Sequence, residues 1–106
     1  MRIISGYLKG KSFKFLKNNH TRPLKDSVKE SVFNILKHSK FINVKVENSN
    51  ILDLYSGIGS FGLESISRGA RQVTFIEKDK LAVEILKENL NKLSIINKAK
   101  IFNEMV

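Results

Sequence analysis

The chain carries one pattern that most constrains its fold: an apolar run, a glycine-rich turn, a helix and a second apolar run that ends in an acid. The apolar run 51–54 precedes three glycines, Gly57, Gly59 and Gly62, which match the spacing G-x-G-x-x-G. Glu77 ends the second run, 20 positions after Gly57. Because doubly wound α/β proteins hold nucleotide cofactors at such a turn, we predict a site for a nucleoside-bearing cofactor.

The residue types in this pattern suit that chemistry. Glycine allows positive φ angles and has no Cβ that would block a ligand. A helix that begins near Ser60 would direct its free N–H groups and its dipole at the turn, where an anion gains about 0.3–1 kcal/mol. The carboxylate of Glu77 can accept both hydroxyls of a ribose. The alternative is a tightly packed turn with a solvated acid at its far end.

Asp53, four residues before Gly57, distinguishes between two cofactors. A dinucleotide would bring its pyrophosphate against the turn, and a carboxylate there would repel it. S-adenosylmethionine carries a sulfonium and an ammonium group that suit an acid, and a carboxylate that suits the helix N-terminus. We therefore predict S-adenosylmethionine. In the alternative interpretation, Asp53 only caps local backbone N–H groups.

Length and composition indicate one soluble domain. A chain of 106 residues can bury one modest core, and no run of about 18 apolar residues suggests a membrane span. The chain has no cysteine, and its two histidines, His20 and His38, lack metal-ligand spacing, so we expect neither a disulfide nor a metal site. The N-terminal residues do not resemble a signal peptide, so we expect a cytoplasmic protein without membrane contacts.

The net charge of +9 is concentrated in the N-terminal half. Residues 1–50 contain 11 Lys and Arg against three acidic residues, whereas residues 51–106 contain eight against seven. A basic region of this kind can contact nucleic-acid phosphates without reading sequence. In the alternative, these lysines only cover solvated faces.

The first twenty residues are predicted to form a basic hairpin that turns at Gly6 and Gly10. Phe13 and Phe15 share one strand face, and we expect both to pack in the core. A loop at Asn18-Asn19-His20 follows, and then an extended Arg22 before Pro23.

A helix is predicted to begin near Ser27, where Ser27 and Glu30 have the spacing of a capping box. Its buried face should carry the apolar residues at helical spacing, Val28, Val32, Ile35 and Leu36. Residues 39–50 are expected to form a polar connection.

The second half alternates strands and helices. Strands are predicted at 51–54, 73–76 and 99–103, with helices at about 60–68 and after Asp79, which should cap the second helix. Glu88 and Lys92 should form an i,i+4 pair on the exposed face of that helix. The order β-α-β-α-β is that of the first half of a doubly wound parallel sheet.

Four segments resemble the N-terminal part of the RsmD-type methyltransferases, which modify the exocyclic N2 of a guanine in small-subunit (16S) ribosomal RNA. They are the opening Arg2-Ile-Ile-Ser-Gly-Tyr-Leu-Lys-Gly-Lys, Thr21-Arg22-Pro23 with Asp26-Ser-Val-Lys-Glu-Ser-Val-Phe-Asn-Ile-Leu, Asp53-Leu-Tyr-Ser-Gly-Ile-Gly-Ser-Phe-Gly-Leu-Glu with Ser67-Arg68-Gly69-Ala70, and Phe75-Ile76-Glu77-Lys78-Asp79. The resemblance implies part of a class I, Rossmann-like S-adenosylmethionine-dependent methyltransferase fold, preceded by a basic hairpin and helix. Residues 1–45 would then face RNA, and residues 46–106 would form the first half of the cofactor domain.

The resemblance also implies roles for particular residues. Asp53, Gly57 and Gly59, with the turn residues Tyr55 and Ser56, would border the methionine part of S-adenosylmethionine. Glu77 would bind the ribose, and Lys78 and Asn103 would lie near the adenine. RNA contacts are expected from the basic residues of the N-terminal region, Arg2, Lys9, Lys11, Lys14 and Arg22. Leu24 and Ser27 depart from the family pattern, which has Thr and Arg there.

Methyltransferases of this type present the target amine with an Asn/Asp-Pro-Pro-Tyr/Phe loop, whereas the only proline here is Pro23. We therefore assign no catalytic residue. The resemblance places a fourth strand beside strand 51–54; without it, that strand has an open edge, and we predict marginal stability or self-association. The expected partner is small-subunit ribosomal RNA or an assembling ribosomal subunit. The alternatives are a noncatalytic basic RNA-binding module and an NAD-binding half-domain.

Overall fold

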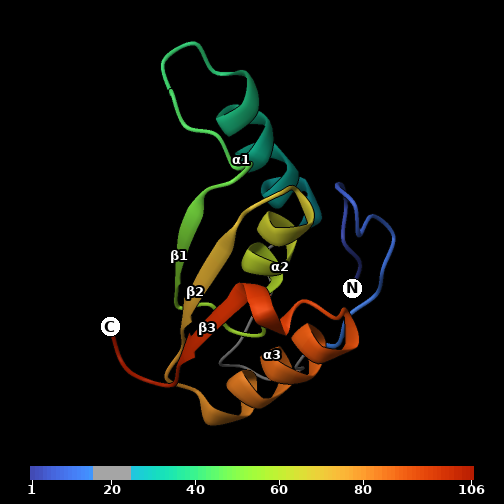
Figure 1. The fold of residues 1–106 in the computed structure, drawn as a ribbon, viewed down its shortest axis with the longest axis vertical. Helices are drawn as coiled ribbons and strands as arrows, with labels where there is room; N and C mark the ends of the chain where they lie inside the picture. The colour runs from blue at the N-terminus through green and yellow to red at the C-terminus, as the bar shows by residue number, and fades with distance from the viewer. Residues whose placement is uncertain (16–24) are drawn as a thin grey trace.

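Three parallel strands form the centre of the structure, a computed structural model that describes residues 1–15 and 25–106 (Figure 1). The strands are β1 (Asn50–Leu54), β2 (Gln72–Ile76) and β3 (Ala99–Phe102), in the order β1-β2-β3. Leu54 is in register with Ile76, which is in register with Phe102. The predicted β-α-β-α-β order and the α/β fold class are confirmed.

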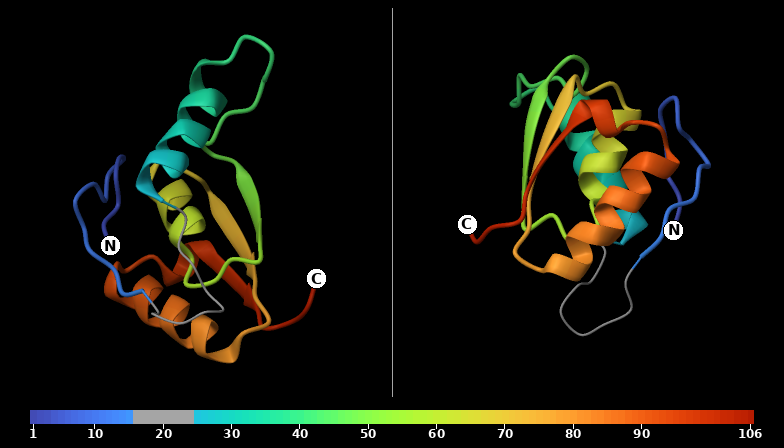
Figure 2. Two further views of the ribbon diagram at one scale, coloured as in Figure 1. Left: turned by 180° about the vertical axis from the view of Figure 1, so that it is seen from behind. Right: turned by 60° about the horizontal axis from the view of Figure 1, so that its bottom comes forward.

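Two helices connect these strands and cover one face of the sheet (Figures 1 and 2). They are α2 (Ser60–Ser67) and α3 (Lys80–Lys92), and a 3-10 turn (Ile96–Lys98) leads into β3. Both crossovers step in the same direction along the sheet, and right-handed connections then place both helices on the same side. The first helix, α1 (Asp26–His38), packs against α2 through Phe33 and Phe61, whose stacked rings have centroids 4.9 Å apart.

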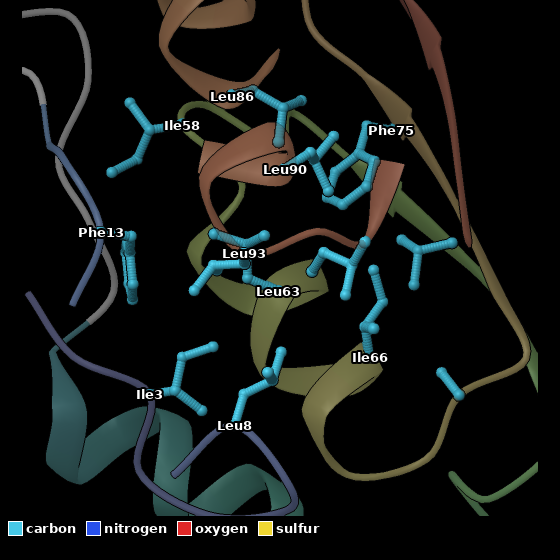
Figure 3. Close-up of a cluster of buried hydrophobic side chains, with 13 residues drawn as sticks. Ile3, Leu8, Phe13, Ile58, Leu63, Ile66, Phe75, Leu86, Leu90 and Leu93 are labelled. Atoms are coloured by element: carbon cyan, nitrogen blue, oxygen red, sulfur yellow. The ribbon is translucent and has the colours of Figure 1, made fainter. Parts of the chain in front are cut away.

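The hydrophobic core lies between the sheet and these helices (Figure 3). Val73 and Phe75 point into it from β2, while Leu86 and Leu90 enter from α3, and all four side chains are fully buried. The N-terminal residues complete the core with three buried apolar side chains, Ile3, Leu8 and Phe13.

The opposite face of the sheet is open in the described part of the chain. Side chains alternate between the faces of a strand, so Leu52, Leu54 and Phe102 point away from α2 and α3. They are 58%, 42% and 45% exposed. β1 is also an edge strand, so the predicted open apolar edge is present.

The N-terminal segment forms the predicted hairpin, but its regular pairing is one antiparallel bridge between Arg2 and Ser12. Gly6 has a φ angle of +89°, and a Cβ built on it would lie 2.0 Å from the carbonyl oxygen of Ser67. Only glycine can therefore bring the hairpin this close to the end of α2. Phe13 is buried as predicted, whereas the prediction for Phe15 was wrong, because its side chain is 42% exposed.

The helix predicted near Ser27 is present as α1, but two details of that prediction were wrong. The helix begins at Asp26 without a side-chain cap, and Ser27 lies inside its first turn, so the capping box is not formed. Its buried residues are Lys29 and Phe33, while Val28 and Ile35 are 45% and 54% exposed. The reason is tertiary: the inward face of α1 meets buried polar groups of α2, described below.

Two further predictions concern α3. Asp79 caps the helix, since its carboxylate accepts hydrogen bonds from the backbone N–H groups of Leu81 and Ala82, as predicted. The Glu88–Lys92 prediction was wrong, because Glu88 pairs with Lys14 at 3.0 Å and Lys92 donates to the Ser12 hydroxyl. The predictions for the loop at 18–20 and for Arg22 lie outside the described residues.

Candidate functional site

The predicted cofactor residues meet at the carboxyl ends of the strands, where open α/β sheets bind ligands. Two segments 20 residues apart join there. The backbone N–H of Gly57 donates to Oε1 of Glu77 at 2.8 Å, and the N–H of Ser56 donates to the carbonyl of Ile76 at 3.1 Å. The turn after β1 is thus closed onto the end of β2.

Glu77 is only 9% exposed, and both of its carboxylate oxygens accept backbone hydrogen bonds. Oε1 accepts from Gly57, and Oε2 accepts from the N–H of Asp79 at 2.8 Å. An ionised carboxylate has about four acceptor positions, so each oxygen keeps one more. The side chain is therefore held in place and can still accept two hydroxyl donors.

Asp53 lies on the helix-covered face of β1, in register with Phe75. Its Oδ2 accepts the N–H of Gly62 in the first turn of α2, at 3.2 Å. Burial raises the pKa of this carboxyl from 3.8 to about 6, against the lowering effect of the Gly62 bond, and the nearby Glu77 raises it slightly further. A cation placed beside Asp53 would offset this desolvation and favour the ionised form.

The second and third glycines of the turn serve packing. Gly59 has a φ angle of +91°, and a Cβ there would lie 2.3 Å from Cδ1 of Leu86. A Cβ on Gly62 would lie 2.2 Å from the ring of Phe75. These two glycines bring α2 close to the sheet and to α3, which positions its N-terminus beside Asp53.

A pocket of about 520 Å³ opens next to Glu77 and is also lined by Lys78, Asp79, Asn103, Glu104 and Met105. The amide nitrogen of Asn103 donates to the carbonyls of Glu77 and Lys78, at 2.9 and 3.1 Å. These bonds fix the amide, and its oxygen has no hydrogen-bond donor within residues 1–15 and 25–106, so it can accept from an amino group. Lys78 is exposed at the rim.

The remaining predicted residues occupy the periphery. Tyr55 has a φ angle of +55° and is 73% exposed, so its ring is accessible above the turn. Arg2, Lys9 and Lys11 are exposed on the N-terminal hairpin, well separated in sequence from the turn. Lys14 is exposed as well, but its ammonium pairs with Glu88.

Sequence reasoning missed a buried polar cluster behind the turn. Glu64 of α2 is fully buried and accepts the backbone N–H groups of Ile4 and Ser5 at 2.9 and 3.0 Å. It also pairs with Arg68 at 2.9 Å and with the fully buried Lys29 of α1 at 3.5 Å. The i,i+4 spacing of Glu64 and Arg68 was the only local signal, since Lys29 lies 35 positions away in the sequence.

Lys29 connects this cluster to the turn. Its ammonium group lies 3.2 Å from the hydroxyl of Ser60, the first residue of α2. Asn89 fixes the hairpin in a comparable way: its side-chain amide exchanges two hydrogen bonds with the backbone of Lys14, at 2.8 and 2.9 Å. The Asn89 amide also donates to the carbonyl of Ile58 at 3.4 Å, so α1 and the hairpin are both attached beside residues 58–60.

The site is compatible with an S-adenosyl group. It offers a fixed carboxylate with two free acceptor positions, an amide oxygen in a pocket, and an acid beside a helix N-terminus. Within residues 1–15 and 25–106, no cluster of three potential metal ligands and no helix long and apolar enough to cross a membrane is found.

Comparison with known proteins identifies a family and relatives named as methyltransferases. A family model described as "Conserved hypothetical protein 95" matches residues 1–106. "Putative rRNA methyltransferase YlbH" of Bacillus subtilis is 37% identical over 102 residues, which make up 96% of this chain and 52% of the relative. "Ribosomal RNA small subunit methyltransferase D" of Haemophilus influenzae is 39% identical over 93 residues, 88% of this chain and 45% of the relative.

Solved structures agree with these relatives. "Putative methyltransferase yhhF from Escherichia coli" superposes with a TM-score of 0.83 at 30% identity, over 99% of this chain and 52% of that one. The chain therefore spans about half the length of the relatives it matches.

Proposed function

Because the chain belongs to the Conserved hypothetical protein 95 family, as the resemblance to RsmD-type methyltransferases predicted, we propose that it binds S-adenosylmethionine for the methylation of small-subunit ribosomal RNA. The acceptor we propose is the exocyclic N2 of a guanine. The chain supplies the donor site and part of the RNA-binding surface. It contains no residue to which we assign a catalytic role.

The bond between Gly57 and Glu77 carries this proposal. It joins the turn after β1 to the acid after β2 and orients a carboxylate toward a pocket at the edge of the sheet. The two acceptor positions left on Glu77 match the two hydroxyls of a ribose in number. A merely solvated acid would be exposed, whereas Glu77 is 91% buried and fixed on both oxygens.

The other parts of the cofactor have matching groups. The free amide oxygen of Asn103 can accept from the adenine amino group, with Lys78 beside it. Asp53 and the N-terminus of α2 complement the cationic and carboxylate groups of the methionine part. When bound, S-adenosylmethionine supplies an electrophilic methyl group on its sulfonium.

The same observations argue against an NAD half-domain. The carboxyl of Asp53 is partly buried and held at the first turn of α2 by Gly62. A pyrophosphate would have to approach this acid and would be repelled by its charge.

RNA contacts are proposed for the exposed basic residues of the hairpin. Arg2, Lys9 and Lys11 lie on a segment that Glu64 and Asn89 hold rigidly against the core. Lys14 and Arg22 remain further candidates. These residues alone would also serve a noncatalytic RNA-binding module. An RNA substrate of this kind agrees with a cytoplasmic protein.

The decisive experiment is calorimetric titration with S-adenosylhomocysteine, the demethylated cofactor. The wild-type chain should bind it, and Glu77→Gln should bind about 10- to 100-fold more weakly, since a charge-assisted hydrogen bond is worth about 1.5–3 kcal/mol. Glu84→Gln, the same change at an exposed position of α3, is the matched control. Absence of binding to the wild type, or equal losses in both variants, would refute the cofactor site. RNA binding without cofactor binding would instead favour the noncatalytic module.

A further inference from the structure

A second pocket, of about 530 Å³, lies at the other end of α2 from the cofactor turn. The hairpin, α1 and residues 44–47 surround it, and Arg68 at the C-terminal end of α2 forms part of its wall. Since α2 has eight residues, its two ends are about 12 Å apart. The pocket is therefore separate from the site beside Glu77.

Arg68 is held rigidly at this pocket. Its Nε donates to Glu64 at 2.9 Å, and its guanidinium lies over the ring of Phe33 with a centroid distance of 4.3 Å. The side chain is 16% exposed. Its terminal nitrogens make no hydrogen bond or ion pair to residues 1–15 and 25–106, so their donors remain available. A fixed guanidinium with free terminal donors is suited to a phosphate.

The rest of the wall combines positive charge with apolar surface. Lys37 of α1 and Lys45 are exposed and add two cations, against one carboxylate from Glu47. Leu36 and Val44 supply an apolar side, and Val44 is 55% exposed. Along a single-stranded nucleic acid, charged phosphate groups alternate with flat bases that have apolar faces. The cations of this wall suit the phosphates, and its apolar side suits the face of a base.

We propose that this pocket binds one nucleotide of single-stranded RNA, with Arg68, Lys37 and Lys45 at its phosphates and the Leu36–Val44 side against its base. The proposal rests on the proposed function, because it takes the substrate to be RNA. The hairpin that carries Arg2, Lys9 and Lys11 also lines the pocket through Ser5 and Gly6. The RNA is then held at a point well away from the methyl donor. Binding there would orient the RNA without any contact with the reacting atoms.

Binding of a fluorescent single-stranded RNA octamer, measured by polarisation at several salt concentrations, tests this pocket. The double variant Lys37→Gln/Lys45→Gln changes exposed residues only, whereas a change at Arg68 would disturb the buried Glu64 cluster. We expect at least a tenfold weaker affinity and a salt slope reduced by about 1.4, at about 0.7 for each phosphate contact on a single strand. The matched control Lys80→Gln/Lys87→Gln on α3 should leave both values near those of the wild type.

A crosslinking experiment locates the bound strand directly. An octamer that carries 4-thiouridine should crosslink to residues 33–47 of the wild type, and unlabelled octamer should compete while polyglutamate should not. Equal losses in both double variants, crosslinks only outside the pocket, or better competition by polyglutamate would overturn the proposal. S-adenosylhomocysteine binding, measured on the same samples, reports on the cofactor site independently.

Discussion

The two faces of the sheet contain similar apolar side chains in opposite surroundings. On the face covered by α2 and α3, Val73 and Phe75 are fully buried. On the other face, Leu52 and Phe102 are 58% and 45% exposed. The residues proposed for the cofactor depend on the covered face, since Asp53 lies on it and Gly59 and Gly62 pack α2 against it. These three strands are therefore sufficient to position the residues of the proposed donor site, but one face of the sheet is left open among the described residues.

Among the described residues, one face of the sheet is open and β1 has an unpaired edge. Parallel sheets are normally covered on both faces, and an unpaired strand edge can pair with another chain. We propose that the isolated chain self-associates through this surface. Substitutions on the covered face should therefore affect stability, whereas those on the open face should affect association.

The largest expected effect comes from the buried cluster on the covered side. Glu64→Gln should destabilise the fold by about 3–5 kcal/mol, because it removes the buried carboxylate partner of Lys29 and leaves only the exposed Asp26 at 3.9 Å. Glu88→Gln, which breaks the exposed pair with Lys14, should cost at most about 1 kcal/mol. Urea unfolding of the two variants measures both values, and equal costs would mean that the cluster contributes no more than a surface ion pair.

The next effect compares one aromatic residue on each face. Phe75→Ala should lower the free energy of unfolding by about 3–5 kcal/mol, because it leaves a cavity between β2 and the helices. Phe102→Ala should cost about 1 kcal/mol or less, because its side chain is already in contact with water. Thermal unfolding distinguishes the two, and a large cost at Phe102 would indicate that the open face is covered in solution.

Asp53 should show a trade-off between stability and binding. Its folded pKa of about 6 lies above the unfolded value of 3.8, so its contribution to stability is present below about pH 4 and is lost as the pH rises through 6. Asp53→Asn should therefore stabilise the protein at pH 7, by at most about 3 kcal/mol, and reduce the difference between pH 5 and pH 7.

The same change should weaken binding of S-adenosylmethionine, and wild-type binding should weaken below pH 6 as Asp53 is protonated. Unfolding and calorimetric titrations at both pH values measure these effects. A variant that binds as tightly as the wild type would show that Asp53 only caps the N–H of Gly62.

The smallest effect on stability is expected at the open face. Leu52→Lys places a charge on the open face, in the same cross-strand row as Thr74 and Lys100. The substitution should change the free energy of unfolding by about 0.5 kcal/mol or less. It should nevertheless shift the chain toward the monomer in sedimentation velocity. An unchanged distribution of sedimentation coefficients would mean that the chain self-associates through another surface. A monomeric wild type would refute the proposal of self-association.

Local signals predicted the second half of the chain well. Short apolar runs mark the strands, and Asp79 caps α3 through the next two residues, so the positions of these elements have local causes. The contacts of Gly59, Gly62 and Glu77 with Leu86, Phe75 and Gly57 join residues that are distant in the sequence. The helix α1 was predicted, but its buried face was not, because that face is determined by Glu64, a residue of another helix. Val28 and Ile35 have helical spacing, but they are 45% and 54% exposed. The pocket at Arg68 could not be predicted either, since its walls come from four separated segments.

Titration of isotopically labelled protein with S-adenosylhomocysteine, followed by the backbone amide NMR signals, tests the central claim most directly. We expect the signals of Gly57, Glu77 and Asn103 to shift together and saturate with one equivalent of ligand. Those of Leu52 and Lys100 on the open face should stay in place. Shifts confined to the open face, or no shift at Gly57 and Glu77 at saturating ligand, would contradict the assignment of this turn as the methyl-donor site.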